Sequence, residues 1–318
     1  MRSPVFVLGA LLLVQCAVTA FVYWPEASPQ GVEAPGPLIN LKPEAVAEIH
    51  VADELGNEIV LENRGGRWVM AETDGLPADS QKVATLLRSI SQPRPAWPVA
   101  TTAPARQRFQ VADYHYQRRI ILIGQEQLLG TVYLGTSPGF RKVHARADRQ
   151  QAVFSIEFSN HDAPATAEPW LDLALMQMRV PVSVTTDVYD IRREGDQWVS
   201  GWGETPDRRE LMALLDSLEN LQVAGLAGEE LQRDLAAAEP ELTLHADSLS
   251  GGQSLELYRL DGRFYIHSSR FTPFFELSEY EYQKLAGIDA ERMMGGAPEQ
   301  AGEGADPGPG ELVSSPPR

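Results

Sequence analysis

The sequence predicts an α+β fold, with two tandem copies of a mostly antiparallel sheet after an N-terminal transmembrane helix. Three observations lead to this prediction. An apolar run opens the chain, one pattern of strands and helix occurs twice, and neither copy alternates strand and helix as a parallel sheet would. Each copy is expected to hold a hairpin, a helix and a four-stranded meander.

The first element is the apolar run from Val5 to Trp24, which contains one strongly polar residue. Its length suits a hydrocarbon core of roughly 30 Å. Arg2 is the one basic side chain before Lys42, and this bias places the N-terminus in the cytoplasm. We therefore expect residues 1–24 to form a single-pass anchor in the inner, cytoplasmic membrane, with a periplasmic or extracytoplasmic remainder. Cleavage after Val18-Thr19-Ala20 is the alternative.

Two further segments are expected to lie outside the folded part. Residues 25–37 are rich in Pro, Gly, Ala and Glu, which is typical of an extended spacer. Residues 293–318 have too few large apolar side chains to offset the entropy of ordering, and we expect them to be disordered. The remaining chain divides into a first repeat over residues 38–178 and a second over 179–292.

Each repeat opens with a hairpin that ends near a Trp and leads into a helix. Trp68 and Trp198 hold equivalent places 130 residues apart. Asp79 is expected to cap the first helix, and Thr205 followed by Pro206 to begin the second. Apolar residues in both helices follow the spacing of a helix packed on one face, namely Val83, Leu86, Leu87 and Ile90, then Leu211, Leu214, Leu215 and Leu218.

Four strands are expected after each helix, and their alternation suits sheets that a helix covers on one side. In the first repeat they are Arg119–Ile123, Thr131–Leu134, Lys142–Arg146 and Ala152–Phe158. In the second they are Glu241–Leu244, Ser254–Leu257, Arg263–His267 and Pro273–Leu277.

These features together resemble a known family. The N-terminal run, Gly65-Gly66-Arg67-Trp68-Val69, the helix after Asp79, Val132-Tyr133-Leu134-Gly135 and Val143-His144-Ala145-Arg146 are similar to the family catalogued as domain of unknown function 4340. Its members are membrane-anchored envelope proteins, and some are similar to auxiliary components of gliding-type ABC transport systems. The resemblance implies an accessory role of that kind and brings no catalytic residues with it.

Two patterns that could carry chemistry receive structural interpretations. Gly135-Thr136-Ser137-Pro138-Gly139 matches the nucleophile elbow of hydrolases, but a strand rather than the required helix is expected after it, which favours a hairpin turn. His144 and His267, on matching strands of the repeats, are expected to be exposed. No two His have a metal-ligand spacing, and the single Cys excludes a disulfide framework. We predict no catalytic, cofactor-binding or metal-binding residues.

Charge distinguishes the repeats more clearly than any motif. The chain has 27 basic and 44 acidic residues and a net charge of −17, which argues against nucleic-acid binding. Residues 41–178 carry −2 and residues 179–294 carry −11. Basic side chains concentrate in the first repeat and could meet lipid headgroups or an acidic partner. The candidate interaction surface comprises Arg118, Arg119, Arg141, Lys142 and Arg146, together with Trp97.

The sequence therefore predicts a non-enzymatic, membrane-anchored envelope protein whose duplicated ectodomain binds a membrane or envelope protein. An accessory role in an ABC-type transport system follows from the resemblance. A module that binds an envelope glycan or polymer is the alternative, and a hydrolase with a site between the repeats is a further one. No cofactor is expected.

Overall fold

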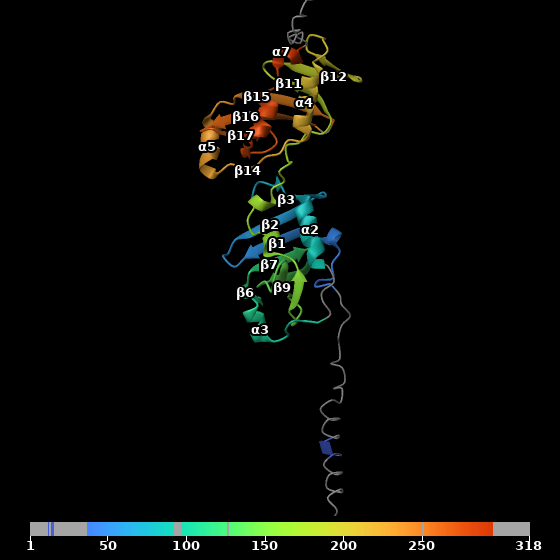
Figure 1. The fold of residues 1–318 in the computed structure, drawn as a ribbon, viewed down its shortest axis with the longest axis vertical. Helices are drawn as coiled ribbons and strands as arrows, with labels where there is room; N and C mark the ends of the chain where they lie inside the picture. Colours follow the sequence, from blue (N-terminus) through green and yellow to red (C-terminus); the bar gives the residue numbers. More distant parts are fainter. Residues whose placement is uncertain are drawn as a thin grey trace, which may run out of the picture. The chain divides into compact units, whose positions relative to one another are not determined.

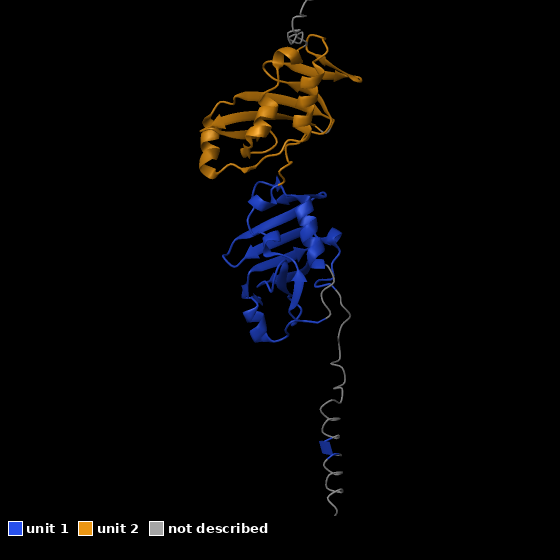
Figure 2. Ribbon diagram, in the orientation of Figure 1, with its two compact units in different colours: residues 1–171 blue, residues 172–318 orange. Residues whose placement is uncertain are grey.

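A computed structural model describes residues 12, 14, 15, 37–91, 97–125, 127–249 and 251–294. They belong to two compact units, Met1–Leu171 and Asp172–Arg318, each described by itself below (Figure 2). The division falls before the predicted junction at 178/179 because the connecting segment packs on the second unit. There Met178 N donates to Leu218 O over 3.0 Å, and the Gln253 side chain donates to Met176 O over 2.7 Å.

The first unit is built on an antiparallel sheet with the strand order β10-β9-β8-β7-β1-β2-β3-β4 (Figure 1). Consecutive strands pair through short turns, except where β7 pairs with β1. The bounds are β1 Glu48–Asp53, β2 Glu58–Arg64, β3 Arg67–Met70, β4 Leu76–Pro77, β7 Arg118–Ile123, β8 Leu128–Leu134, β9 Lys142–Ala147 and β10 Phe154–Glu157.

One face of this sheet is covered by a helix, and the other is covered over β8 and β9. Helix α2 (Ser80–Ser91) buries the four predicted apolar residues against one face. Asp79 accepts hydrogen bonds from the amides of Gln81 and Lys82, which confirms the predicted cap. The other face meets α3 (Ala103–Arg108) and the hairpin of β5 (Val111–Ala112) and β6 (His115–Tyr116), around a buried cluster of Val111, Tyr133 and Val153. Single 3-10 turns lie at η1 Pro43–Ala45, η2 Asn160–Asp162 and η3 Glu168–Trp170.

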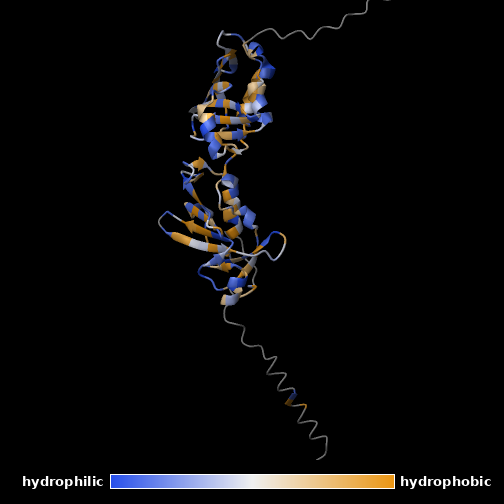
Figure 3. Cartoon of the chain, turned by 90° about the vertical axis from the view of Figure 1, so that its left-hand side faces the viewer, coloured by the Kyte–Doolittle hydropathy of each residue, from blue (hydrophilic) through white to orange (hydrophobic). Residues whose placement is uncertain are grey.

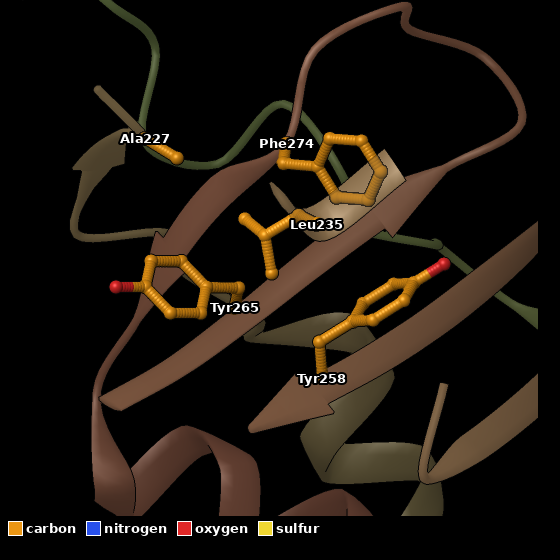
Figure 4. Close-up of a cluster of buried hydrophobic side chains, with 5 residues drawn as sticks. All are labelled: Ala227, Leu235, Tyr258, Tyr265 and Phe274. Atoms are coloured by element: carbon orange, nitrogen blue, oxygen red, sulfur yellow. The ribbon is translucent and has the colours of Figure 1, made fainter. Parts of the chain in front are cut away.

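The second unit repeats this plan with the order β13-β12-β11-β15-β16-β17-β18-β14. Its strands are β11 Pro181–Thr185, β12 Asp190–Glu194, β13 Gln197–Ser200, β14 Gly225–Leu226, β15 Leu242–Ser248, β16 Gly251–Leu260, β17 Arg263–Ser268 and β18 Phe275–Leu277. Its helices are α4 Arg208–Glu219, α5 Glu229–Ala237, α6 Glu279–Ala286 and α7 Ala290–Met293. From α5, Leu235 packs among Tyr258, Tyr265 and Phe274 (Figure 4).

Seven strands occur in the same order in both units, which supports an internal repeat. Trp68 lies opposite Asn63 in β2, and Trp198 lies opposite Arg193 in β12. Colouring by hydropathy shows apolar and polar residues alternating along the strands of each unit (Figure 3). The predicted α+β class with mostly antiparallel sheets is confirmed.

Some predictions are wrong in detail. Helix α4 begins at Arg208, after Thr205 and Pro206, because the Asp207 carboxylate accepts from the amides of Arg209 and Glu210 and forms the cap. Helices α3, α5, α6 and α7 were not predicted, since each is too short to show a clear apolar pattern.

The predicted anchor and spacer lie outside the described residues except for Leu12, Val14, Gln15 and Pro37, and so does the tail from residue 295 onward. Among the residues that the structure describes, no helix is both long and apolar enough to cross a membrane.

Candidate functional site

Three of the predicted basic residues line one pocket of about 420 Å³ at an end of the first unit's sheet. Arg118 begins β7 and Lys142 begins β9, while Arg141 belongs to the loop before β9. Antiparallel pairing brings these strand starts to the same end, where Lys142 lies opposite Glu157, the last residue of β10. The other lining residues are Glu54, Gln117, Ser137, Val143, Phe158, Ser159, Asn160 and His161.

Backbone carbonyls hold Arg118 in this pocket, and Asp53 lies opposite it across β1 and β7 without forming an ion pair. Arg118 donates through Nε to Ala163 O over 2.9 Å and through Nη1 to Gln117 O over 2.7 Å. Neither Arg141 nor Lys142 forms an ion pair with any residue that the structure describes. The lining therefore sets three cationic side chains against the single carboxylate of Glu54. Such an arrangement attracts an anionic group.

The Gly-x-Ser-x-Gly string forms the turn between β8 and β9, as predicted. Ser137 Oγ lies 2.7 Å from both Gly139 O and Lys142 O, so its hydroxyl proton is donated to backbone carbonyls within the turn. The chain continues directly into strand β9. A nucleophile elbow needs a free hydroxyl at the start of a helix, and this serine has neither.

Arg146 lies away from the pocket and is buried, with 6% of its surface exposed. Its guanidinium donates to Val111 O over 2.7 Å, to Ala147 O at the end of β9 over 3.2 Å, and to Asp148 O and Gln150 O after β9 over 3.3 Å. It also lies over the Tyr133 ring, 4.6 Å from the centroid. Burial lowers the pKa of Arg146, but an arginine still keeps its charge at neutral pH. Its predicted place on the interaction surface is wrong, because α3 and β5 cover this face of the sheet.

The prediction that His144 is exposed is also wrong, because α3 and β5 cover this strand face and leave His144 7% exposed. Its ring stacks on Phe109, with centroids 4.1 Å apart, and Nδ1 donates to Thr136 O over 2.8 Å. Burial lowers its pKa below the ordinary 6.5, although the bond to Thr136 acts in the opposite direction.

The remaining two candidates also lie apart from the pocket. Arg119 follows Arg118 in β7 and so points to the opposite face, where it lies 3.7 Å from Glu58 and over the Tyr116 ring. Trp97 is 71% exposed. It precedes Val99, whose amide bonds to Val153 O just before β10 begins, at the end of that strand farther from Lys142.

The second unit has different side chains at the positions that correspond to Tyr133 and Arg146 of the first. Tyr133 lies opposite Arg146 across β8 and β9, and at the same place in the second unit Glu256 lies opposite His267. His267 therefore corresponds to Arg146 and not to His144. Its Nδ1 lies 3.1 Å from Glu256, which also accepts from the Tyr258 hydroxyl. Within the described residues, no group of three or more His, Cys, Asp or Glu side chains is arranged to hold a metal ion.

The first unit has two further hollows among its described residues. A groove of about 850 Å³ lies at the opposite end of the sheet and is lined largely by amide side chains and backbone, including Asn63, Gln125 and Gln127. A smaller one of about 320 Å³ adjoins the cationic pocket through His161 and is bordered by Trp170.

Sequence reasoning missed one side of the pocket and an exposed aromatic residue that precedes two of its basic residues in the chain. Ser159, Asn160 and His161 follow β10 and carry no local pattern that predicts them beside Arg118. Phe140 is 91% exposed in the β8–β9 loop. A large apolar residue between a Gly and a basic pair was the available signal for it.

One of the comparisons with known proteins gives a match. No curated protein and no solved structure matches the chain. A family model described as domain of unknown function (DUF4340) matches residues 68–242, which is more than half of the chain. The match runs from Trp68 in β3 to Leu242 at the start of β15 and so includes parts of both units. The chain belongs to the DUF4340 family.

Proposed function

We propose that this chain is a non-enzymatic, membrane-anchored protein of the cell envelope that binds an acidic segment of a partner protein through its first unit. An accessory role in an ABC-type transport system is the setting that we propose for it. The observation that carries the proposal is the pocket in which Arg118, Arg141 and Lys142 meet without ion-pair partners among the described residues.

The energetics of the pocket favour a charged partner. An unpaired cation at the edge of a protein interacts strongly with an incoming carboxylate, because the local dielectric constant is lower than that of water. Charges arranged in this way mainly set specificity and the rate of association. Arg118 is half-buried and fixed by two carbonyl oxygens, so it loses little side-chain entropy on binding.

The position of the pocket favours a protein partner over lipid headgroups. The N-terminal segment joins the sheet at the start of β1, where Ala47 N bonds to Ile123 O at the end of β7. Arg118 lies at the other end of β7, opposite Asp53 at the end of β1. The six residues of β1 separate these ends by about 20 Å. The pocket is thus at the end of the sheet opposite to the one where the chain enters β1.

Co-purification of the full chain from its own membranes in a mild detergent tests the proposal. The double variant Arg141→Glu/Lys142→Glu should lose the bound partner. The matched control Arg67→Glu/Arg149→Glu reverses two exposed charges of the same unit outside the pocket and should retain it. Binding should also weaken at high salt. Recovery of the wild-type chain alone, or equal recovery with both double variants, would contradict the proposal.

A further inference from the structure

We infer that the segment bound at the cationic pocket carries a large apolar side chain close to its carboxylates, and that Phe140 is the residue that receives it. This inference rests on the proposed function and specifies the partner's chemistry. Phe140 directly precedes the two exposed cations, Arg141 and Lys142, and has the largest exposed fraction among the exposed large apolar side chains of the described residues, 91%.

The loop that presents Phe140 is ordered by its own hydrogen bonds. Ser137 Oγ lies within 2.7 Å of Gly139 O and Lys142 O, Lys142 N bonds to Gly139 O over 3.2 Å, and Phe158 N bonds to Arg141 O over 3.1 Å. Arg141 has a φ of 49°, a left-handed conformation that ends the loop sharply before β9. The backbone on both sides of Phe140 is therefore fixed by hydrogen bonds, while its ring is exposed to solvent. Aromatic residues, Phe among them, are enriched in the buried cores of protein interfaces.

Phe140 does not itself line the pocket, but it directly precedes Arg141 and Lys142, which do, and apolar side chains line the pocket as well. Val143 and Phe158 line it and are otherwise buried, at 1% and 4% exposure. The cations Arg118, Arg141 and Lys142 line the same space. A segment with carboxylates alone would leave the Phe140 ring in water. A segment with both kinds of side chain would pair with the cations and remove Phe140 from solvent together.

The concave shape favours a narrow peptide over a flat bilayer. Arg118 is tied to Ala163 O and Gln117 O on the pocket wall, and it cannot extend past the more exposed Arg141 and Lys142 to a planar surface. An extended peptide can enter a hollow of about 420 Å³ and reach all three cations. The bilayer and a second copy of this chain, whose residues 179–294 carry −11, are the competing occupants.

A displayed library of randomised 12-residue peptides, selected on the purified full chain, tests the inference. The enriched peptides should combine at least two Asp or Glu with a Leu, Ile, Phe or Trp nearby. A synthetic peptide of the consensus should bind at least tenfold more weakly to Phe140→Ala, as expected for an aromatic anchor. Trp97→Ala removes another exposed aromatic side chain, at 71% exposure and outside the pocket, and should leave the affinity unchanged. Matching far-UV circular dichroism verifies the fold of each variant.

The outcomes separate this inference from the proposed function. Acidic peptides whose binding needs Arg141 and Lys142 but tolerates Phe140→Ala would overturn the inference and leave the proposed function standing. An absence of acidic enrichment, or binding that tolerates Arg141→Glu/Lys142→Glu, would overturn both. Phe140-dependent binding to vesicles with equal parts of phosphatidylglycerol and phosphatidylcholine, without acidic enrichment, would identify a bilayer as the occupant. Salt-sensitive self-association lost in Phe140→Ala would identify a second copy.

Discussion

Replacing Arg146 with methionine should destabilise the first unit substantially. The guanidinium serves four backbone carbonyls that no other described side chain reaches, and it joins β9 to β5 and to the turn before β10. Methionine has a similar length and is flexible enough to fill the space. The change therefore removes the hydrogen bonds and the charge without opening a large cavity.

The size of this loss of stability depends on how deeply the four acceptor carbonyls are buried. The bonds to Val111 O and Ala147 O are buried, whereas those to Asp148 O and Gln150 O are partly buried and can be replaced by water. A bond from a charged donor contributes about 1.5–3 kcal/mol, and stacking on Tyr133 adds about 1 kcal/mol. Release of the buried cation from its desolvation cost offsets part of this. We expect a net loss of about 2–4 kcal/mol for Arg146→Met.

Hydrogen exchange on the full chain, read by mass spectrometry, would localise the effect. Peptides from β5 and β9 should exchange faster in Arg146→Met, while those from β16 and β17 should be unchanged. Urea unfolding followed by circular dichroism would give the free-energy change. Arg149→Met, an exposed position three residues on, should change stability by less than about 0.5 kcal/mol. If Arg146→Met matched the wild type in both measurements, the assigned role of the guanidinium would be wrong.

Two further predictions concern the same covered face. Gly135→Ala should lower the free energy of unfolding in urea by about 2–4 kcal/mol, because a Cβ there would lie 1.9 Å from Phe109 O. A Cβ at Gly139 would have no atom within 4 Å, so Gly139→Ala should be near neutral. Equal losses of stability in the two variants would refute the close approach at Gly135. The pKa of His144 in the folded state is lowered from 6.5, chiefly by burial. The stability that the neutral ring contributes to the first unit is therefore complete above pH 6.5 and is lost as the pH falls toward the folded pKa. His144→Phe should flatten the decline in first-unit stability between pH 7 and pH 5, and an unchanged slope would exclude His144 as its source.

Much of the fold could be predicted because it depends on local patterns. The stripe from Val83 to Ile90 predicts one buried helix face, and the cap at Asp79 predicts where the helix begins. The turn at Ser137 was recognisable because a strand follows it. The exposure of His144 and Arg146 could not be predicted, since β9 is covered on its second face by α3 and β5. These elements are too short to show an apolar period of their own.

In the candidate site, too, some features could be predicted from the sequence and others depended on the tertiary structure. The sequence by itself determined that basic residues concentrate in the first repeat and that the second is strongly acidic. Only the tertiary structure decided that Arg118, Arg141 and Lys142 share one pocket, that Arg119 faces away from it and that Arg146 is buried. The physical reason is that charge is a property of composition, whereas convergence depends on strand pairing. Antiparallel registry brings the starts of β7 and β9 to one end of the sheet, although their residues lie far apart in the chain.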